Sequence, residues 1–196
     1  LIYKVTTKIF VKKDLLILDI EATGLDYEKH EIIQLAGILL DKETLKEKKS
    51  FNTFIRPRNW KGRSREAMAV NNISWDMVKD APNLKTALTT FQKTFGTDVT
   101  VSPYGTIMDT AMLRIAYRKS KMKYKFDYHV FDIWPLVYVF MAKKKLLKNT
   151  RRFTGFGLED AAKHFKIAVP KDRHTALTDC QIQAQVLREI MKRIKL

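Results

Sequence analysis

The sequence contains a single cysteine, Cys180, among its 196 residues. One cysteine excludes an internal disulfide and any zinc site built from several cysteines, and it fits a reducing compartment. A charged and then apolar signal segment is also missing before the first strand, so nothing in the sequence supports secretion. We therefore expect a cytoplasmic, intracellular protein, with Cys180 on the core side of a helix.

Long hydrophobic runs are also missing. The most apolar stretch, Val130–Ala142 ("VFDIWPLVYVFMA"), is short and contains Asp132 and Pro135, whereas a helix that crosses a bilayer needs about 20 apolar residues. We expect no membrane span. The 45% of hydrophobic residues is still enough for one sizeable core at this length, and we expect residues 1–196 to form a single domain.

Acidic residues are scarce relative to basic ones. The chain has 21 Asp and Glu against 37 Lys and Arg, which gives a formal net charge of +16. An excess of this size favours a polyanionic partner, for which nucleic acid is the leading candidate. An anionic membrane surface, or a charge that serves solubility alone, are the alternatives.

Two carboxylates interrupt the first apolar run, Leu15–Leu25 ("LLILDIEATGL"). Asp19 and Glu21 are two residues apart, so in a strand their side chains point the same way and lie side by side. Adjacent carboxylates repel each other unless one takes up a proton or a positive charge lies between them. The pattern therefore favours a divalent cation at this position.

The hydrophobic pattern predicts an α/β fold, because a group of strands comes first and strands then alternate with helices around a mixed sheet. The second and third strands are expected to form a hairpin around Asp41 to Thr44, which makes the first three strands neighbours. Gly96 is expected to end a helix and Pro135 to lie in the first turn of another. On the helix at 106–119, we expect Ile107, Met112 or Ala111, and Ile115 on one side. The predicted strands are 14–22, two within 30–57, 97–105 and 129–134, and the predicted helices are 64–70, 74–81, 83–95, 106–119, 135–145, 157–167 and 175–195.

Two further acids fall near helix starts. Asp109 lies in the first turn of the helix after the fourth strand, and Asp179 lies in the first turns of the last helix. Taken singly, each is best explained as a helix cap or dipole partner, worth a few tenths to about 1 kcal/mol. Taken together with Asp19 and Glu21, they form an ordered set that ends in His-x-x-x-x-Asp, from His174 to Asp179.

This set resembles the DEDDh branch of the DnaQ-like 3′-to-5′ exonucleases, a family that includes proofreading subunits of replicative DNA polymerases and ribonuclease T. The three motifs are "LDIEATGL", "YGTIMDTAML" and "HTALTD", and the resemblance extends from about residue 15 to about residue 190. His174 places the chain in the His branch. The resemblance implies a ribonuclease H-like fold with a five-stranded mixed sheet flanked by helices.

By resemblance, two divalent cations, Mg²⁺ or Mn²⁺, are expected in the site. Asp19, Glu21 and Asp179 would hold one, and Asp19 together with Asp109 would hold the other. Ligation by oxygen alone favours these ions over zinc, and a pair of cations suits phosphodiester hydrolysis. His174, with an ordinary pKa of about 6.5, can take a proton from water at neutral pH and is the expected general base.

The resemblance also places substrate contacts on the loop after the first strand, at Ala22, Thr23, Gly24 and Leu25. The alternative is an ordinary exit from a strand, with Gly24 supplying the turn. In the second motif, Gly105 and Met108 stand where many family members have Asn and an aromatic residue. This departure leaves open how the penultimate nucleotide is held, and with it the substrate preference.

Two segments combine basic residues in a way that suits nucleic acid. Residues 117–129 ("YRKSKMKYKFDYH") interleave five basic residues with Tyr117, Tyr124, Phe126 and Tyr128, a combination suited to phosphate contact and base stacking. Residues 142–152 ("AKKKLLKNTRR") contain six more basic residues. A solvated lysine surface is the alternative, but we expect at least one of the segments to contact nucleic acid.

The leading hypothesis is a metal-dependent 3′-to-5′ exonuclease that releases nucleoside 5′-monophosphates from single-stranded ends, with DNA slightly favoured over RNA. An RNA-trimming exoribonuclease, a non-catalytic nucleic-acid-binding module on the same fold, and a sugar-nonspecific repair nuclease within a larger complex are the alternatives. The expected partner is a single-stranded 3′ end. A polymerase or a second copy of the chain are the candidate protein partners.

Overall fold

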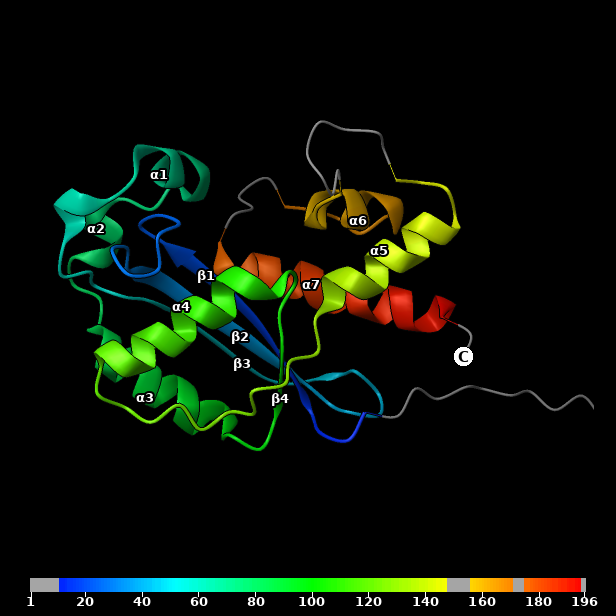
Figure 1. Cartoon of the computed structure of the whole chain (residues 1–196), viewed down its shortest axis with the longest axis horizontal. Coiled ribbons are helices and arrows are strands. Elements are labelled where there is room, and N and C mark those ends of the chain that lie inside the picture. The colour runs from blue at the N-terminus through cyan, green and yellow to red at the C-terminus, as the bar shows by residue number, and fades with distance from the viewer. Residues whose placement is uncertain (1–10, 148–155, 171–174, 195–196) are drawn as a thin grey trace, which may run out of the picture.

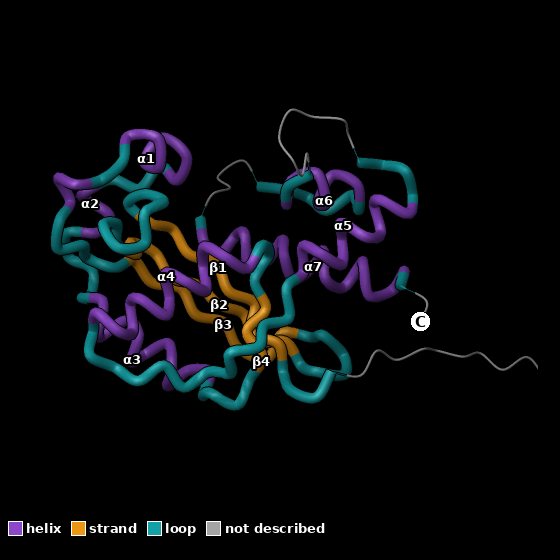
Figure 2. Tube along the Cα trace, viewed as in Figure 1, coloured by secondary structure: helices purple, strands orange, loops and turns teal. Residues whose placement is uncertain are grey.

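The computed structural model describes residues 11–147, 156–170 and 175–194. Within these residues, one mixed sheet of four strands has the order β3-β2-β1-β4 (Figure 1, Figure 2). The strands are β1 (Leu15–Ala22), β2 (Ile32–Leu40), β3 (Glu47–Phe54) and β4 (Thr100–Ser102).

Helices cover both faces of this sheet, and no helix in the described part of the chain is both long and apolar enough to cross a bilayer. The α/β class inferred from the sequence is therefore confirmed. The helices are the 3₁₀ helix η1 (Trp60–Gly62), α1 (Arg65–Asn71), α2 (Trp75–Val78), α3 (Leu84–Phe95), α4 (Thr106–Lys119), α5 (Ile133–Lys143), α6 (Leu158–His164) and α7 (Ala176–Arg193).

The first three strands are neighbours, as the sequence predicted. β1 and β2 are antiparallel, and β2 and β3 form an antiparallel hairpin. Asp41 closes the hairpin turn by accepting hydrogen bonds from the backbone N–H groups of Glu43 (3.1 Å) and Thr44 (2.8 Å). β2 is buried along its whole length because helices cover both faces of the sheet, which explains its continuous apolar sequence.

The prediction of a strand at 129–134, and with it of a fifth strand, is wrong for the described chain. Val130 forms only an isolated parallel bridge with Val101. Two residues later, Asp132 caps α5 by accepting a hydrogen bond from the backbone N–H of Trp134 (2.9 Å). Because the helical conformation of α5 begins at Ile133, directly after Asp132, the chain leaves the sheet after a single bridge.

The two faces of the sheet have separate cores. Leu15 and Ile17 of β1 pack against α5, α6 and α7, whereas Leu16 and Leu18 pack against α3 and α4. In Figure 1, α5, α6 and α7 lie together on one side of the molecule, and α1 and α2 lie near the end of β1. Alternate residues of β1 therefore face different layers, as the period of a strand requires.

Helix ends agree with the sequence prediction in part. Gly96 ends α3 in a left-handed conformation with φ of 74°. Pro135 lies in the first turn of α5, which begins two residues earlier than predicted. Of the two alternatives on α4, Ala111 and not Met112 shares a side with Ile107, because Met112 is 3% exposed whereas Ile107 is 76% exposed. Five residues rotate a helix by about 140° beyond a full turn, so Ile107 and Met112 cannot share one face.

Candidate active site

One face of β1 changes from apolar to acidic along the strand. Leu15 and Ile17 pack beneath α7, and because side chains two residues apart share a face, Asp19 and Glu21 continue the same row. The first turn of α7 adds Asp179. One carboxylate oxygen from each of the three acids lies within 4.8 Å of the others. The structure thus brings three of the four predicted acids into one group.

The start of α7 is tied to the sheet beside this group. Thr175 caps the helix by accepting a hydrogen bond from the backbone N–H of Thr178 (3.3 Å). The backbone N–H of Ala176 donates to Oε1 of Gln34 (3.2 Å), which stands opposite Glu21 on β2. These contacts fix the acid in the first turn of α7 relative to the acids of β1.

Gln183 also reaches this group. It lies one turn beyond Asp179, on the same side of α7, and its Nε2 donates a 2.8 Å hydrogen bond to Oδ1 of Asp19. Gln183 was not identified from the sequence. The available signal was its spacing of four residues from Asp179, which places both side chains on one helix face.

Asp109 approaches the group from the other side of β1. β4 pairs with β1 only as far as Ile17, and beyond this point the carboxylate of Asp109 accepts a hydrogen bond from the backbone N–H of Ile20. Asp109 is not part of the group within 4.8 Å, but its charge raises the pKa values of Asp19 and Glu21. The fourth predicted acid therefore shares the electrostatic environment of the other three.

Burial and mutual repulsion raise the pKa values of these carboxyls. For Asp19, burial is the largest cause, and the charges of Asp109 and Asp179 add to it, so its pKa lies well above its usual range. Burial, followed by the same two charges, raises the pKa of Glu21 to about 8. Burial also raises the pKa of Asp109 to about 7, against the effect of its hydrogen bond from Ile20. Without a cation, this cluster retains protons at neutral pH.

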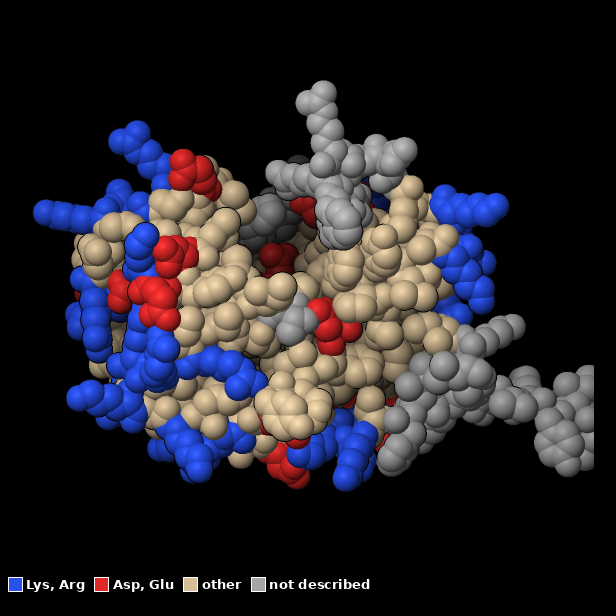
Figure 3. All heavy atoms as spheres, in the orientation of Figure 1, with Lys and Arg blue, Asp and Glu red and all other residues tan. Residues whose placement is uncertain are grey.

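A cleft of about 270 Å³ opens beside Glu21. Figure 3 shows acidic side chains in a hollow near the centre of the drawn face. The exposed side chains of Leu25 (70% exposed) and Val70 (56% exposed) give the cleft an apolar side that suits a nucleotide base. The lining residues are Ile20, Glu21, Ala22, Gly24, Leu25, Ser64, Glu66, Ala67, Val70, Asn71 and Met108.

The predicted substrate contacts divide into two sets. Thr23 is buried; its hydroxyl accepts a hydrogen bond from the N–H of Glu31 (2.9 Å) and its carbonyl accepts one from the N–H of Ser64 (2.7 Å). Gly105 precedes α4 with φ of 89°, and its N–H donates to Asp132 (2.9 Å). These two residues shape the site. The other four predicted contacts are among the residues that line the cleft: Ala22, Gly24, Leu25 and Met108.

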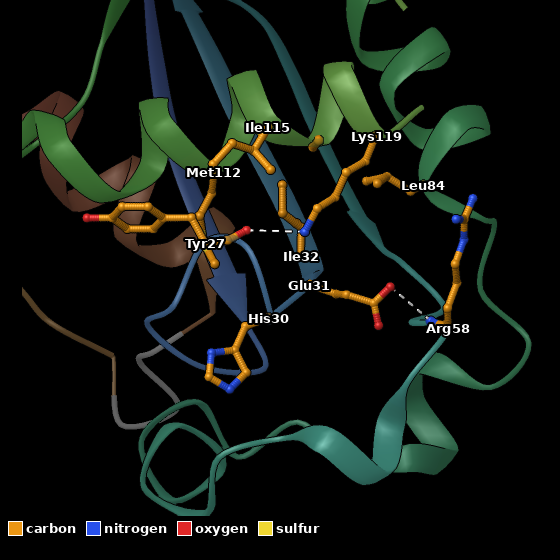
Figure 4. Close-up of a pocket in the computed structure, with 10 residues that line it drawn as sticks. Tyr27, His30, Glu31, Ile32, Arg58, Leu84, Met112, Ile115 and Lys119 are labelled. Carbon is orange, nitrogen blue, oxygen red and sulfur yellow. Dashed lines mark hydrogen bonds between the residues drawn. The ribbon is translucent and has the colours of Figure 1, made fainter. Parts of the chain in front are cut away.

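The loop between β1 and β2 is held in place by close packing. A Cβ atom on Gly24 would collide with the ring of His30, so a larger residue there requires the imidazole to move. At the end of α4, the Nζ of Lys119 donates to the carbonyls of Tyr27 (3.3 Å) and Glu28 (2.6 Å), the first of which is drawn in Figure 4. The loop that lines the cleft at Gly24 and Leu25 is therefore anchored to α4 a few residues further on, at Tyr27 and Glu28.

A second pocket lies between this loop and α4 (Figure 4). Its floor is apolar, with Ile32, Leu84 and Met112, and Glu31 accepts a hydrogen bond from the backbone N–H of Arg58 (3.2 Å) at its edge. Its volume of about 40 Å³ has room for a few water molecules. It is too small for a nucleotide.

Sequence reasoning missed two further polar residues near the acids. Asn71 donates to the carbonyl of Ala22 (3.1 Å) and also hydrogen-bonds Glu21, but its place at the end of α1 gave no signal. Asp132 holds the start of α4, and an Asp directly before an apolar helix is a recognisable cap. His174, the predicted general base, lies outside the described residues, as do residues 148–152 of the second basic segment.

Comparisons with known proteins agree with this geometry. A family model described as exonuclease, RNase_T, matches residues 16–187. The DNA polymerase III PolC-type of Bacillus subtilis (strain 168) is 25% identical over 190 residues, which cover 97% of this chain and 12% of that protein. The chain thus corresponds to a small part of this curated relative.

Solved exonucleases share the fold. Exonuclease I of E. coli in complex with a dA16 oligonucleotide gives a TM-score of 0.76 at 15% identity, covering 94% of this chain and 41% of that chain. The nuclease domain of 3′hExo, a DEDDh family member bound to rAMP, gives 0.68 at 22% identity, covering 93% of this chain and 94% of that chain. At these identities the likeness establishes the ribonuclease H-like fold.

Proposed function

We propose that the chain, which belongs to the RNase T exonuclease family, is a 3′-to-5′ exonuclease that uses two divalent cations to release nucleoside 5′-monophosphates from single-stranded 3′ ends. The observation that carries this proposal is the group of Asp19, Glu21 and Asp179 oxygens beside the apolar cleft. A metal site and a base-binding cleft side by side suit cleavage next to a terminal nucleotide.

The acids fit Mg²⁺ or Mn²⁺. All ligand atoms are carboxylate oxygens, which these hard cations prefer. No Lys or Arg within the described ranges forms an ion pair with Asp19 or Glu21. A bound cation would therefore neutralise the repulsion between these carboxylates. Asp19, Glu21 and Asp179 would hold one cation, and Asp19 with Asp109 the other.

Different side chains have different roles in the proposed hydrolysis. When bound, the cations lower the pKa of the attacking water and stabilise charge on the phosphate in the transition state. His174 would accept the proton of that water as general base. Gln183 and Asn71 orient Asp19 and Glu21 through hydrogen bonds, while Leu25 and Val70 exclude water around the terminal base.

We propose single-stranded DNA as the preferred substrate. The relative in Bacillus subtilis is a DNA polymerase, and E. coli Exonuclease I was solved with dA16, which supports DNA. The nuclease domain of 3′hExo was solved with rAMP, which supports RNA as the competing substrate.

A gel assay tests the function directly. DNA and RNA single strands of one sequence, labelled at the 5′ end, are incubated with the protein and Mg²⁺, Mn²⁺ or a chelator. A ladder that shortens by one nucleotide at a time and requires metal is the expected result, with the faster substrate deciding between DNA and RNA. Metal-independent binding without any cleavage would instead identify a non-catalytic binding module.

Replacing His174 tests the general base. His174→Ala is expected to lower kcat by about 10²- to 10⁴-fold, because the water loses its proton acceptor. Binding of Mn²⁺, followed by calorimetry, should stay the same since the imidazole is not among the proposed ligands. His164→Ala, which removes an exposed imidazole on α6, is the matched control. A loss of less than tenfold in His174→Ala would reject the assignment.

Gln183→Leu is expected to weaken cation binding. The 2.8 Å hydrogen bond from Gln183 stabilises the charged form of Asp19, which is the form that binds metal. Loss of such a hydrogen bond to a ligand usually costs about 10- to 100-fold in metal affinity. The measurement is calorimetric titration with Mn²⁺, and Gln181→Leu, at an exposed position of α7, is the control. Equal affinities of the two variants would show that Gln183 does not position Asp19.

A further inference from the structure

Six basic residues lie on the C-terminal half of α4 and the segment that follows it, and we call them the α4 basic band. No acidic residue occurs between positions 110 and 126. Figure 3 shows Lys and Arg side chains gathered over this region, on the same face as the central hollow. The band consists of Arg114, Arg118, Lys119, Lys121, Lys123 and Lys125.

The segment after α4 places its charges outward by simple alternation. Lys121, Lys123 and Lys125 are exposed, whereas the residues between them are half-buried or buried. None of the three lysines forms an ion pair with a residue that the structure describes. By contrast, Arg118 is paired with Glu28 (2.5 Å). The three lysines are the part of the band most available to an anionic partner.

The sequence suggested that the aromatic residues of this segment form a surface for base stacking, but two of these residues point into the core. Tyr117 is fully buried and Phe126 is 5% exposed, with ring centroids 6.2 Å apart in the core. The prediction that these two rings stack on bases is therefore wrong. Tyr128 remains 74% exposed, and its carbonyl accepts a hydrogen bond from Arg114 (3.4 Å). Phosphate contact is thus the main binding mode that this surface offers.

The band is continuous with the active site through one stripe of α4. Ile107, Ala111, Arg114 and Arg118 follow one another at steps of four, three and four residues, so they lie along one side of the helix. The stripe begins with the exposed Ile107, next to Met108 in the cleft, and ends in the band. A strand with its 3′ end in the cleft can follow this stripe.

We propose that the α4 basic band binds the phosphates of nucleotides upstream of the 3′-terminal one, so that the substrate strand runs along α4. This inference rests on the proposed function of the cleft. From Met108 to Arg118 the helix rises about 15 Å, the length of about four to five stacked nucleotides at 3.4 Å each. Affinity should therefore increase with oligonucleotide length up to about six nucleotides and then level off.

The test compares two charge-matched triple variants. Lys121→Gln/Lys123→Gln/Lys125→Gln removes three charges of the band. The comparison variant, Lys143→Gln/Lys144→Gln/Lys145→Gln, removes three exposed charges at the end of α5, which belong to the other basic segment that the sequence offers for nucleic acid, so the pair of variants distinguishes the two segments. The Kd for a labelled single strand of about 20 nucleotides is measured by fluorescence anisotropy in chelator, where no hydrolysis occurs, at several salt concentrations. Circular dichroism checks that all proteins are folded.

The salt dependence gives the decisive readout. For single strands, each phosphate contact contributes about 0.7 to the slope of log affinity against log salt, so the band variant should lose about 2 from that slope. The ratio of its affinity to that of the wild type should therefore rise about twentyfold when the salt concentration increases from about 50 to 200 mM, because the wild type loses affinity faster. The α5 variant should keep the slope of the wild type.

Two results would overturn the inference: an unchanged slope in the band variant, or the same loss of slope in the α5 variant. Hydrolysis of a trinucleotide, which is too short to reach Lys121, Lys123 and Lys125, tests the proposed function separately. If the wild type cleaves the trinucleotide and the band variant keeps its slope, only the band assignment fails. If no metal supports cleavage, the proposed function fails, and the slopes still decide whether the band binds the strand.

Discussion

Asp19→Asn is expected to lower kcat/KM by about a thousandfold or more with either Mg²⁺ or Mn²⁺. Asp19 is the only one of the four acids proposed to contact both cations, and charge stabilisation by bound metal is worth several kcal/mol, or about three powers of ten. Asn has nearly the same shape and can still accept the hydrogen bond from Gln183. The loss should therefore arise from chemistry and not from unfolding.

The measurement is the initial rate on a labelled single strand at saturating metal, together with a thermal melt. Asp98→Asn is the matched control, because the Asp98 side chain is 91% exposed and pairs with Lys13 away from the acids. The control should keep the rate of the wild type. If Asp19→Asn retained a rate within tenfold of the wild type, Asp19 would not be a ligand shared by two cations.

The metal-free protein is expected to lose stability as the pH rises from about 5 to about 8, and Mg²⁺ or Mn²⁺ should remove this loss. Burial and repulsion raise the pKa of Glu21 from 4.5 to about 8 and that of Asp109 from 3.8 to about 7. Between these values the folded protein holds protons that the unfolded chain has released. Stability is then greatest below the unfolded pKa and falls as the pH passes through the folded pKa.

The size of this effect follows from the shifts. One pKa unit corresponds to about 1.4 kcal/mol, so pKa values raised by about three units at each of two carboxyls destabilise the metal-free fold by several kcal/mol at pH 8, with about 9 kcal/mol as the upper bound. For a domain of this size, 1 kcal/mol changes Tm by about 2–4 °C. The measurement is Tm against pH in chelator and with saturating Mn²⁺, where a gain that grows with pH is expected.

Glu21→Gln provides the internal check for this prediction. The neutral amide carries no charge at high pH, so the variant in chelator should melt several degrees above the wild type at about pH 8 and at a similar temperature at about pH 5. Glu47→Gln, on the exposed strand β3, should follow the wild type. A wild-type Tm in chelator that rises across this range would contradict the raised pKa values.

The local parts of the fold were predictable, because they depend on short patterns. The spacing of Asp19 and Glu21 on β1, the hairpin turn at Asp41 and the end of α3 at Gly96 all follow from strand alternation or from a single residue's backbone preference. The four predicted acids come from three separate elements, β1, α4 and α7. Three of these acids lie within 4.8 Å of one another because of the tertiary packing of the elements, which a short stretch of sequence does not reveal.

What the sequence could not supply depends on competition between neighbouring elements. The segment around Val130 is rich in residues that favour strands, but the helix capped by Asp132 begins too soon for a fifth strand to form. Tyr117 and Phe126 lie among lysines in the sequence, yet they point into the core. The link from Gln183 to Asp19 depends on how α7 docks on β1, which is decided by packing across the whole domain.

The wide separation of the site residues along the chain has a consequence during protein synthesis. Asp19 and Gln183 are 164 residues apart, and Asp179 arrives on the last described helix, α7. Domains fold as units once their sequence has emerged, so a ribosome-bound chain lacks a complete set of acids until α7 leaves the exit tunnel.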